Sequence, residues 1–142
     1  MAIRIRLIAS DADRDACYLI RNRVFVDEQK VPPWEEMDAY DDTALHFLAE
    51  EDGKIIGTAR LVRKDERTYK IGRVAVDLEY RSRGLGRELM LHVIEAGFED
   101  CDTLVLDAQV QVIPFYERLE FVAEGPVFLD AGIEHRHMTR MR

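Results

Sequence analysis

Residues 74–87 read Val74-Ala-Val-Asp-Leu-Glu-Tyr-Arg-Ser-Arg-Gly-Leu-Gly-Arg87 and join the end of an expected strand to the start of an expected helix. The two glycines let the backbone approach a ligand closely, and the first amides of a helix have no partner within it. Such a helix end carries about half a positive charge and binds phosphate readily. The arginines at 81, 83 and 87 add guanidinium groups to an otherwise acidic chain. The stretch therefore predicts a pyrophosphate site.

Other interpretations of this stretch fit its residues less well. A flexible glycine turn before a helix, with exposed arginines and no ligand, is the plainest alternative. The dinucleotide motif G-x-G-x-x-G would need Gly or Ala at Leu89, and the phosphate loop of the NTPases would need Gly-Lys followed by Ser or Thr. The strand before, the helix after and the arginine cluster favour the pyrophosphate site.

Upstream of this stretch, apolar alternation predicts strands. They cover residues 3–8, about 44–50, 54–63 and 68–76, with a hairpin turn at Asp52-Gly53. A helix is expected from Asp11, as its N-cap, toward Val26, and Pro32-Pro33 is expected to stop it.

Downstream, Leu85, Leu89, Val93 and Gly97 recur at helical spacing and predict a helix over about 84–98. The expected elements that follow are a strand at 104–106, a helix at 112–119 with Pro114 in its first turn, and strands at 121–124 and 133–141. This order indicates an α/β (α+β) fold with a mixed sheet flanked by helices, in one domain over 1–142, and differs from a doubly wound alternation.

Composition limits the classes of function. The chain has 142 residues and a formal net charge of −8, so nucleic acid is not expected as a partner. Cys17 and Cys101 lie far apart with no zinc-ligand spacing, which predicts reduced thiols and no metal site. No apolar run is long enough for a membrane helix and the start does not resemble a signal peptide, so a soluble cytoplasmic protein is expected.

Two motifs resemble those of a known family. Arg81-x-x-Gly84-x-Gly86, after a strand ending in Val-Ala-Val, resembles the acetyl-CoA signature of the GNAT superfamily, R/Q-x-x-G-x-G/A. Residues 115–121, which begin Phe-Tyr and end in Phe, resemble the second CoA-side motif of the same superfamily, F/L-Y-x-x-x-G-F. Residues 24–29 and 128–133 look like those of a small bacterial subgroup. The resemblance spans nearly the whole chain and implies a GNAT-like, mostly antiparallel central sheet.

The resemblance also implies an activity: acetyl-CoA-dependent transfer of an acetyl group to a primary amine, by direct attack in a ternary complex. Tyr116 would act as the general acid that protonates the leaving thiolate. Backbone groups of Val74 and Val76 would pair with the pantetheine arm, and amides around Arg81–Arg87 would hold the pyrophosphate. The residues implied to bind acetyl-CoA are Val74, Ala75, Val76, Arg81, Ser82, Arg83, Gly84, Leu85, Gly86, Arg87, Gln109 and Tyr116.

The chain departs from the family pattern at three places. Gln109 stands where many members carry Asn, and Glu120 replaces the Gly that usually ends the second motif, so a left-handed residue there would be strained. Some members carry a glutamate general base on the strand before the pyrophosphate loop, but residues 69–76 contain no carboxylate, so the resemblance leaves the base unassigned. Glu28 is taken as the candidate base, and the other candidates considered are Glu36, Asp38, His46, His135 and His137.

The segment 27–42 holds seven acids against one lysine. It is expected on the acceptor side, where it could hold a cationic amine; a solvated loop is the alternative. The residues proposed for substrate binding are Glu35, Glu36, Asp38 and His46. Two other functions stay open: a non-catalytic acetyl-CoA sensor, and an interaction module that uses 27–42 as a partner surface. A homodimer is possible.

Overall fold

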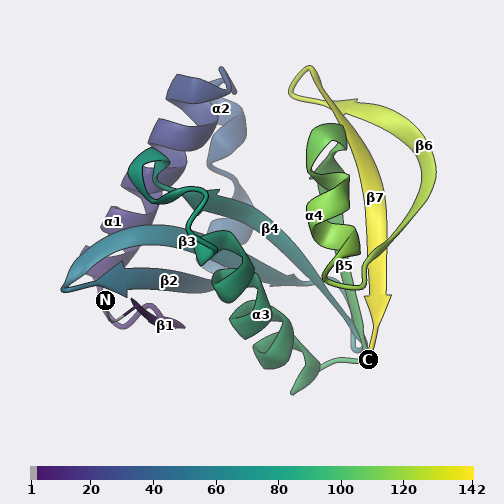
Figure 1. The fold of residues 1–142 in the computed structure, drawn as a ribbon, viewed down its shortest axis with the longest axis horizontal. Coiled ribbons are helices and arrows are strands. Elements are labelled where there is room, and N and C mark those ends of the chain that lie inside the picture. Colours follow the sequence, from purple (N-terminus) through teal and green to yellow (C-terminus); the bar gives the residue numbers. More distant parts are fainter. Residues whose placement is uncertain (1–2) are drawn as a thin grey trace.

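The computed structural model describes residues 3–142, which form one seven-stranded sheet with helices on both faces (Figure 1). The strand order is β1-β2-β3-β4-β5-β7-β6, and every neighbouring pair is antiparallel except β4 and β5. The strands are β1 (Ile3–Leu7), β2 (Leu45–Glu51), β3 (Lys54–Arg63), β4 (Thr68–Val76), β5 (Thr103–Gln109), β6 (Val122–Asp130) and β7 (Ile133–Met141). This mixed, mostly antiparallel sheet confirms the predicted fold class.

Within residues 3–142, four α-helices and four π- or 3-10-helical segments connect the strands. They are α1 (Asp11–Arg21), the π-helical segment η1 (Asn22–Glu28), α2 (Pro33–Glu36), η2 (Ala39–Asp42), η3 (Leu78–Tyr80), α3 (Leu85–Phe98), η4 (Val110–Val112) and α4 (Ile113–Glu117). No helix within residues 3–142 has the length and apolarity needed to span a membrane.

The first helix begins and ends differently from the prediction. Its N-cap is Ser10, not Asp11, because the extended Ser10 accepts a hydrogen bond from the Asp13 amide with its side chain. The helix continues through the π-helical segment to Glu28, two residues beyond Val26. The prolines do not stop it; Pro33 instead opens the short helix α2, since proline is well suited to a first helical turn.

The helices cover both faces of the sheet. A Cβ added to Gly57 on β3 would lie 3.7 Å from Leu89 of α3. The opposite face packs Ala75 of β4 against Ile20 and Val24. The core therefore fixes α3 on one face and α1 with η1 on the other, near the end of β4.

β5 and β6 differ in length from the prediction, whereas β7 has the predicted bounds. β5 runs to Gln109, three residues beyond the expected end, and β6 runs to Asp130 instead of 124. Gly125, with a φ of 77°, lies where the register of β6 with β7 shifts between Glu124 and Phe128. This irregularity interrupts the alternation, so the sequence pattern signals only the first part of the strand.

Candidate functional site

The main cavity lies where two parallel strands separate. β4 pairs with β5 only from Thr68 to Lys70, opposite Thr103–Val105. Beyond Lys70 the strands diverge, while β4 stays paired with β3 up to Val76 on its other side (Figure 1). The edge of β4 that faces β5 therefore has no strand partner, which leaves backbone groups available to a ligand, as in strand addition. A cavity of about 490 Å³ occupies this opening.

A β-bulge shapes the β4 wall of the cavity. Thr58 pairs with Ala75 and Arg60 with Gly72, so two β4 residues oppose the single residue between Thr58 and Arg60. Arg73, one of these two, has a φ of 50°. Bulges bend a strand and redirect its side chains. Arg73 and Val74 both line the cavity as a result.

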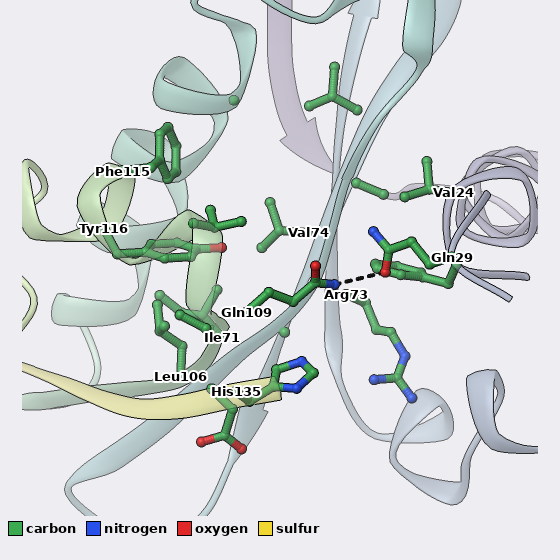
Figure 2. Close-up of a pocket in the computed structure, with 18 of the residues that line it drawn as sticks. Val24, Gln29, Ile71, Arg73, Val74, Leu106, Gln109, Phe115, Tyr116 and His135 are labelled. Atoms are coloured by element: carbon green, nitrogen blue, oxygen red, sulfur yellow. Dashed lines mark hydrogen bonds between the residues drawn. The ribbon is translucent and has the colours of Figure 1, made fainter. Parts of the chain in front are cut away.

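Tyr116 forms the opposite wall. It is half-buried, and its ring makes edge contacts with Phe115 and Phe121, with centroid separations of 5.1 and 6.1 Å. Figure 2 shows its hydroxyl pointing across the cavity toward Val74. Within residues 3–142 that hydroxyl makes no hydrogen bond. Burial raises the pKa of Tyr116 to about 12, so the phenol keeps its proton at neutral pH.

The predicted pyrophosphate loop lies at the mouth of this cavity. Gly84 is the N-cap of α3 and has a left-handed φ of 79°, a conformation that glycine adopts without strain. Arg81 and Gly86 line the cavity, whereas Arg83 and Arg87 are exposed outside it. Leu85 is 2% exposed and does not line the cavity.

Seven of the residues predicted to bind acetyl-CoA thus meet in one cavity. They are Val74, Ala75, Val76, Arg81, Gly86, Gln109 and Tyr116. Ser82, Arg83, Gly84 and Arg87 are exposed beside it. The unpaired edge of β4, the free Tyr116 hydroxyl and the left-handed N-cap are the features that a long, phosphate-bearing ligand needs.

The candidate base Glu28 lies elsewhere. Its two carboxylate oxygens accept hydrogen bonds from Nη2 of Arg81 at 3.0 and 2.7 Å, and it does not line the cavity. Arg81 also donates from Nε to the carbonyl of Val76. Glu28 therefore anchors the predicted pyrophosphate loop to η1.

His135 is the histidine that lines the cavity. Its ring stacks on Phe128 and projects from β7 into the cavity, below Gln109 (Figure 2). Its Nδ1 lies 2.7 Å from the carbonyl oxygen of Ile133. His137, by contrast, contacts Asp107 at 3.0 Å, and Asp107 is also bonded to Lys70.

The acidic segment does not form a free acidic surface. Glu36 and Asp41 are 3% and 6% exposed, and Arg21 bonds both carboxylates at 2.6 and 2.7 Å. Asp38 is bonded by Arg60 at 2.7 and 2.8 Å. Arginines from distant parts of the chain therefore neutralise these three carboxylates. A count of charges within the segment does not reveal these partners. Glu36 is thereby corrected from a substrate ligand to a buried structural residue.

The other two residues proposed for substrate binding are separated. His46 is 4% exposed, and its Nε2 lies 2.9 Å from the carbonyl of Asp41. It lines neither the main cavity nor the cavity that Glu35 lines. Glu35 is exposed and lines a second cavity together with Asp38.

Gln29 and Lys70 also line the cavity, although no sequence motif predicts a role for either residue. Gln109 donates from Nε2 to Oε1 of Gln29 at 2.8 Å, which links β5 to the end of η1 across the cleft (Figure 2). These two residues are far apart in sequence, so no local motif could have paired them.

The chain matches known proteins over nearly its whole length. Residues 8–141 match the model of the acetyltransferase (GNAT) domain family. A Bacillus subtilis protein named as the uncharacterized N-acetyltransferase YjcF is 35% identical over 129 residues, which cover 89% of this chain and 91% of that protein.

Solved structures give the same result. An acyl-CoA N-acyltransferase from Pseudomonas aeruginosa is 30% identical with a TM-score of 0.88, covering 98% of this chain and 99% of that one. A GNAT family acetyltransferase from Elizabethkingia anophelis, solved with acetyl-CoA bound, is 19% identical and shares the fold with a TM-score of 0.73, over 99% of this chain and 98% of that one. With this cleft and these matches, the chain belongs to the GNAT acetyltransferase family.

Proposed function

We propose that this chain is an acetyl-CoA-dependent N-acetyltransferase that moves the acetyl group to a primary amine by direct attack in a ternary complex. The observation that carries the proposal is the opening between β4 and β5, in which the free Tyr116 hydroxyl faces the unpaired edge of β4. Acetyl transfer from acetyl-CoA is general for the family. The acetyl-CoA-bound structure from Elizabethkingia anophelis, which shares the fold, agrees with the proposed ligand.

The binding roles follow from the position of each element. The unpaired backbone of Val74–Val76 would bind the pantetheine arm as an added strand does. The amides from Arg81 to Arg87, at the start of the 14-residue helix α3, would hold the pyrophosphate. Gln109, at the end of β5, would form the cavity wall beside the acetyl group.

The proposed reaction forms a C–N bond, breaks a C–S bond and moves two protons. The amine nitrogen attacks the thioester carbonyl carbon, a C–N bond forms, the C–S bond breaks, and the nitrogen gives one proton to the general base. The departing sulfur takes the proton of the Tyr116 hydroxyl, which its raised pKa keeps protonated at neutral pH. Backbone N–H groups along the open edge of β4 would stabilise the carbonyl oxygen as negative charge develops on it.

We assign the general base to His135. A backbone carbonyl can only accept a hydrogen bond, so Nδ1 of His135 must carry the proton in its contact with Ile133. In the neutral ring this leaves Nε2 as the atom with a free lone pair, and the ring projects into the cavity. Glu28, whose carboxylate is held by Arg81, has no comparable support.

Direct attack is favoured over an acyl-cysteine intermediate. Cys17 is fully buried and Cys101 is 7% exposed, and neither lines the cavity. Burial raises the pKa of the Cys17 thiol, which opposes formation of the nucleophilic thiolate.

Release of CoA thiol from acetyl-CoA, measured with a panel of primary amines, tests the proposal, with calorimetry of acetyl-CoA binding alongside. Amine-dependent thiol release is the expected result. Binding without turnover of any amine would instead identify the non-catalytic sensor, and absence of binding would favour the interaction module. The homodimer and the cytoplasmic location stay predictions, to be checked by light scattering and cell fractionation.

A further inference from the structure

A second cavity, of about 270 Å³, continues from the first on the side away from the phosphate loop. The residues that line both cavities are Lys70, Gly72, Arg73 and Asp130. The remaining lining residues of the second cavity are Glu35, Asp38, Tyr40, Arg60, Val62 and Lys64. Because the first cavity is the proposed site of the thioester, the second is where the rest of an acceptor would extend.

Arg73 lies at the junction of the two cavities and has a hydrogen-bond donor that is not used in the part of the chain that the structure describes. Its Nε and Nη2 donate to the backbone carbonyls of Glu36 and Glu35, at distances from 2.8 to 3.2 Å. Its nearest carboxylates, of Asp38 and Glu36, lie at 3.3 and 3.5 Å. The contact with Asp38 is a hydrogen bond from Nη2, whereas Nη1 makes no hydrogen bond within residues 3–142 and is left to bind a ligand.

Arg73 shares both of its carboxylates with other arginines, Asp38 with Arg60 and Glu36 with Arg21. Asp38 and Asp41 are each committed to Arg60, at 2.7 and 2.8 Å, and Asp41 is also bonded to Arg21. Burial, followed by repulsion from Arg60 and Arg21, lowers the pKa of the Arg73 guanidinium. A negative group placed beside Arg73 would relieve this repulsion.

Lys70 adds a second cation at the junction. Its Nζ contacts Asp107 at 2.8 Å, and an ammonium has two further N–H donors. Gly72 lies between Lys70 and Arg73 on β4 and has no side chain, so nothing projects between the two cavities at that position. Asp130, exposed at the same junction, would attract the ammonium form of an approaching amine.

We propose that Arg73 and Lys70 bind a carboxylate of the acceptor, so that the substrate class is an amino carboxylate with its amine in the first cavity. This inference rests on the proposed function and names its acceptor. The carboxylate is unchanged in the reaction: the amine nitrogen gains the acetyl carbon, and the sulfur leaves as the thiol. The proposal reverses the expectation of a purely cationic amine held by acids 27–42.

Matched pairs of acceptors test the proposal. Glycine, β-alanine, 4-aminobutanoate and 5-aminopentanoate are each compared with the corresponding carboxamide, by kcat/KM from thiol release at saturating acetyl-CoA. For at least one chain length, we expect the carboxylate to exceed its amide by tenfold or more. Turnover of the amides at equal or higher kcat/KM throughout the series would overturn the inference while leaving the N-acetyltransferase function intact.

Charge variants locate the binding group. Lys70→Gln should lower kcat/KM for the preferred carboxylate about tenfold more than for its amide. Arg67→Gln is the matched control, because it removes one positive charge three residues away from a side chain that is 81% exposed. It should leave both acceptors unchanged. An equal loss for carboxylate and amide in Lys70→Gln would contradict a role for Lys70 in carboxylate binding.

Calorimetry makes the test independent of turnover. The N-acetylated product of each acceptor is titrated into the wild-type protein and into Lys70→Gln. Binding of the acetylated carboxylates but not of their amides, weakened in Lys70→Gln, supports the inference even if no acceptor is acetylated. Equal binding of acids and amides, or no binding of either, overturns it. Arg73→Gln is unsuitable as the first variant, because Arg73 also holds the carbonyls of α2.

Discussion

Gln109 and Gln29 close the cleft from opposite sides, with Nε2 of Gln109 donating to Oε1 of Gln29 at 2.8 Å. Gln109 ends β5, and Gln29 caps the π-helical segment that follows α1. β4 and β5 have already separated at this level, so this contact ties together elements that no sheet hydrogen bond connects. The two amides therefore hold β5 and η1 together beside the cavity, which both residues line.

A double-mutant cycle measures this contact. Gln29→Ala, Gln109→Ala and the double variant should give a coupling free energy of about 0.5–1.5 kcal/mol in urea unfolding, the usual net contribution of a neutral hydrogen bond. Acetyl-CoA binding should weaken in both single variants. Strict additivity of the two unfolding free energies would show that the contact contributes nothing to the cleft.

Gly86→Ala tests the position of acetyl-CoA. A Cβ at Gly86 would meet Phe115 at 3.8 Å, an ordinary van der Waals distance, so the fold should be kept while the cavity narrows. We expect the acetyl-CoA dissociation constant to rise roughly tenfold, or about 1.4 kcal/mol, by calorimetry. Thermal unfolding is the control. Gly84→Val is a poorer test, because any side chain at a φ of 79° is strained.

Tyr116→Phe tests the general acid. Loss of the hydroxyl should lower kcat by roughly 10²-fold, the usual scale for a lost acid, with the dissociation constant of acetyl-CoA nearly unchanged. Because burial raises the pKa of Tyr116 to about 12, the wild-type rate should show no loss from deprotonation of this group up to about pH 10. A parallel fall in affinity and thermal stability would indicate a packing role instead.

His135→Gln tests the base through the choice of acceptor. An alkylamine has a pKa near 10.4 and must lose a proton before attack, whereas O-methylhydroxylamine is already unprotonated at neutral pH. We expect kcat to fall about 10²-fold for the alkylamine and much less for O-methylhydroxylamine. His92→Gln, on an exposed position of α3, is the control and should retain both rates. An equal fall in kcat for both acceptors would show that His135 takes no part in proton transfer.

Asp41→Asn tests the buried ion pairs. Burial raises the pKa of Asp41, but hydrogen bonds from Arg21 and the interactions that follow outweigh it and lower the pKa to about 2. The unfolded value is near 3.9, so the stabilisation is present above about pH 4 and is lost as the pH falls toward 2.

At pH 7, Asp41→Asn should lower the free energy of unfolding by about 3 kcal/mol, because two buried guanidiniums lose a carboxylate. Urea unfolding at pH 7, 4 and 2.5 should show a weaker pH dependence in the variant than in the wild type. Asp42→Asn, at the exposed neighbouring position, should change neither quantity. The same pH slope in wild type and Asp41→Asn would exclude Asp41 as its source.

Features that repeat within a few residues were predictable from the sequence. Alternation predicted β3 and β4 with their bounds, and the apolar spacing from Leu85 to Gly97 predicted α3 to within one residue. The glycine-bearing stretch before α3 predicted a helix N-terminus, because backbone geometry there depends on the local residues; the left-handed φ of Gly84 is a finding of the structure. Glu120 confirms the same point, with a φ of 68° where the family pattern has glycine.

Only the tertiary structure decided which charges and side chains meet. The sequence counts Glu36, Asp38 and Asp41 as an acidic segment, yet arginines from α1, β3 and β4 neutralise them once the sheet register is fixed. The cleft itself exists because β4 and β5 pair over three residues and then separate, which no local pattern encodes. Side chains on strands that are distant in the chain meet only through that register. For this reason the sequence predicted a phosphate-binding loop, whereas only the fold brought His135, Lys70 and Arg73 together around one cavity.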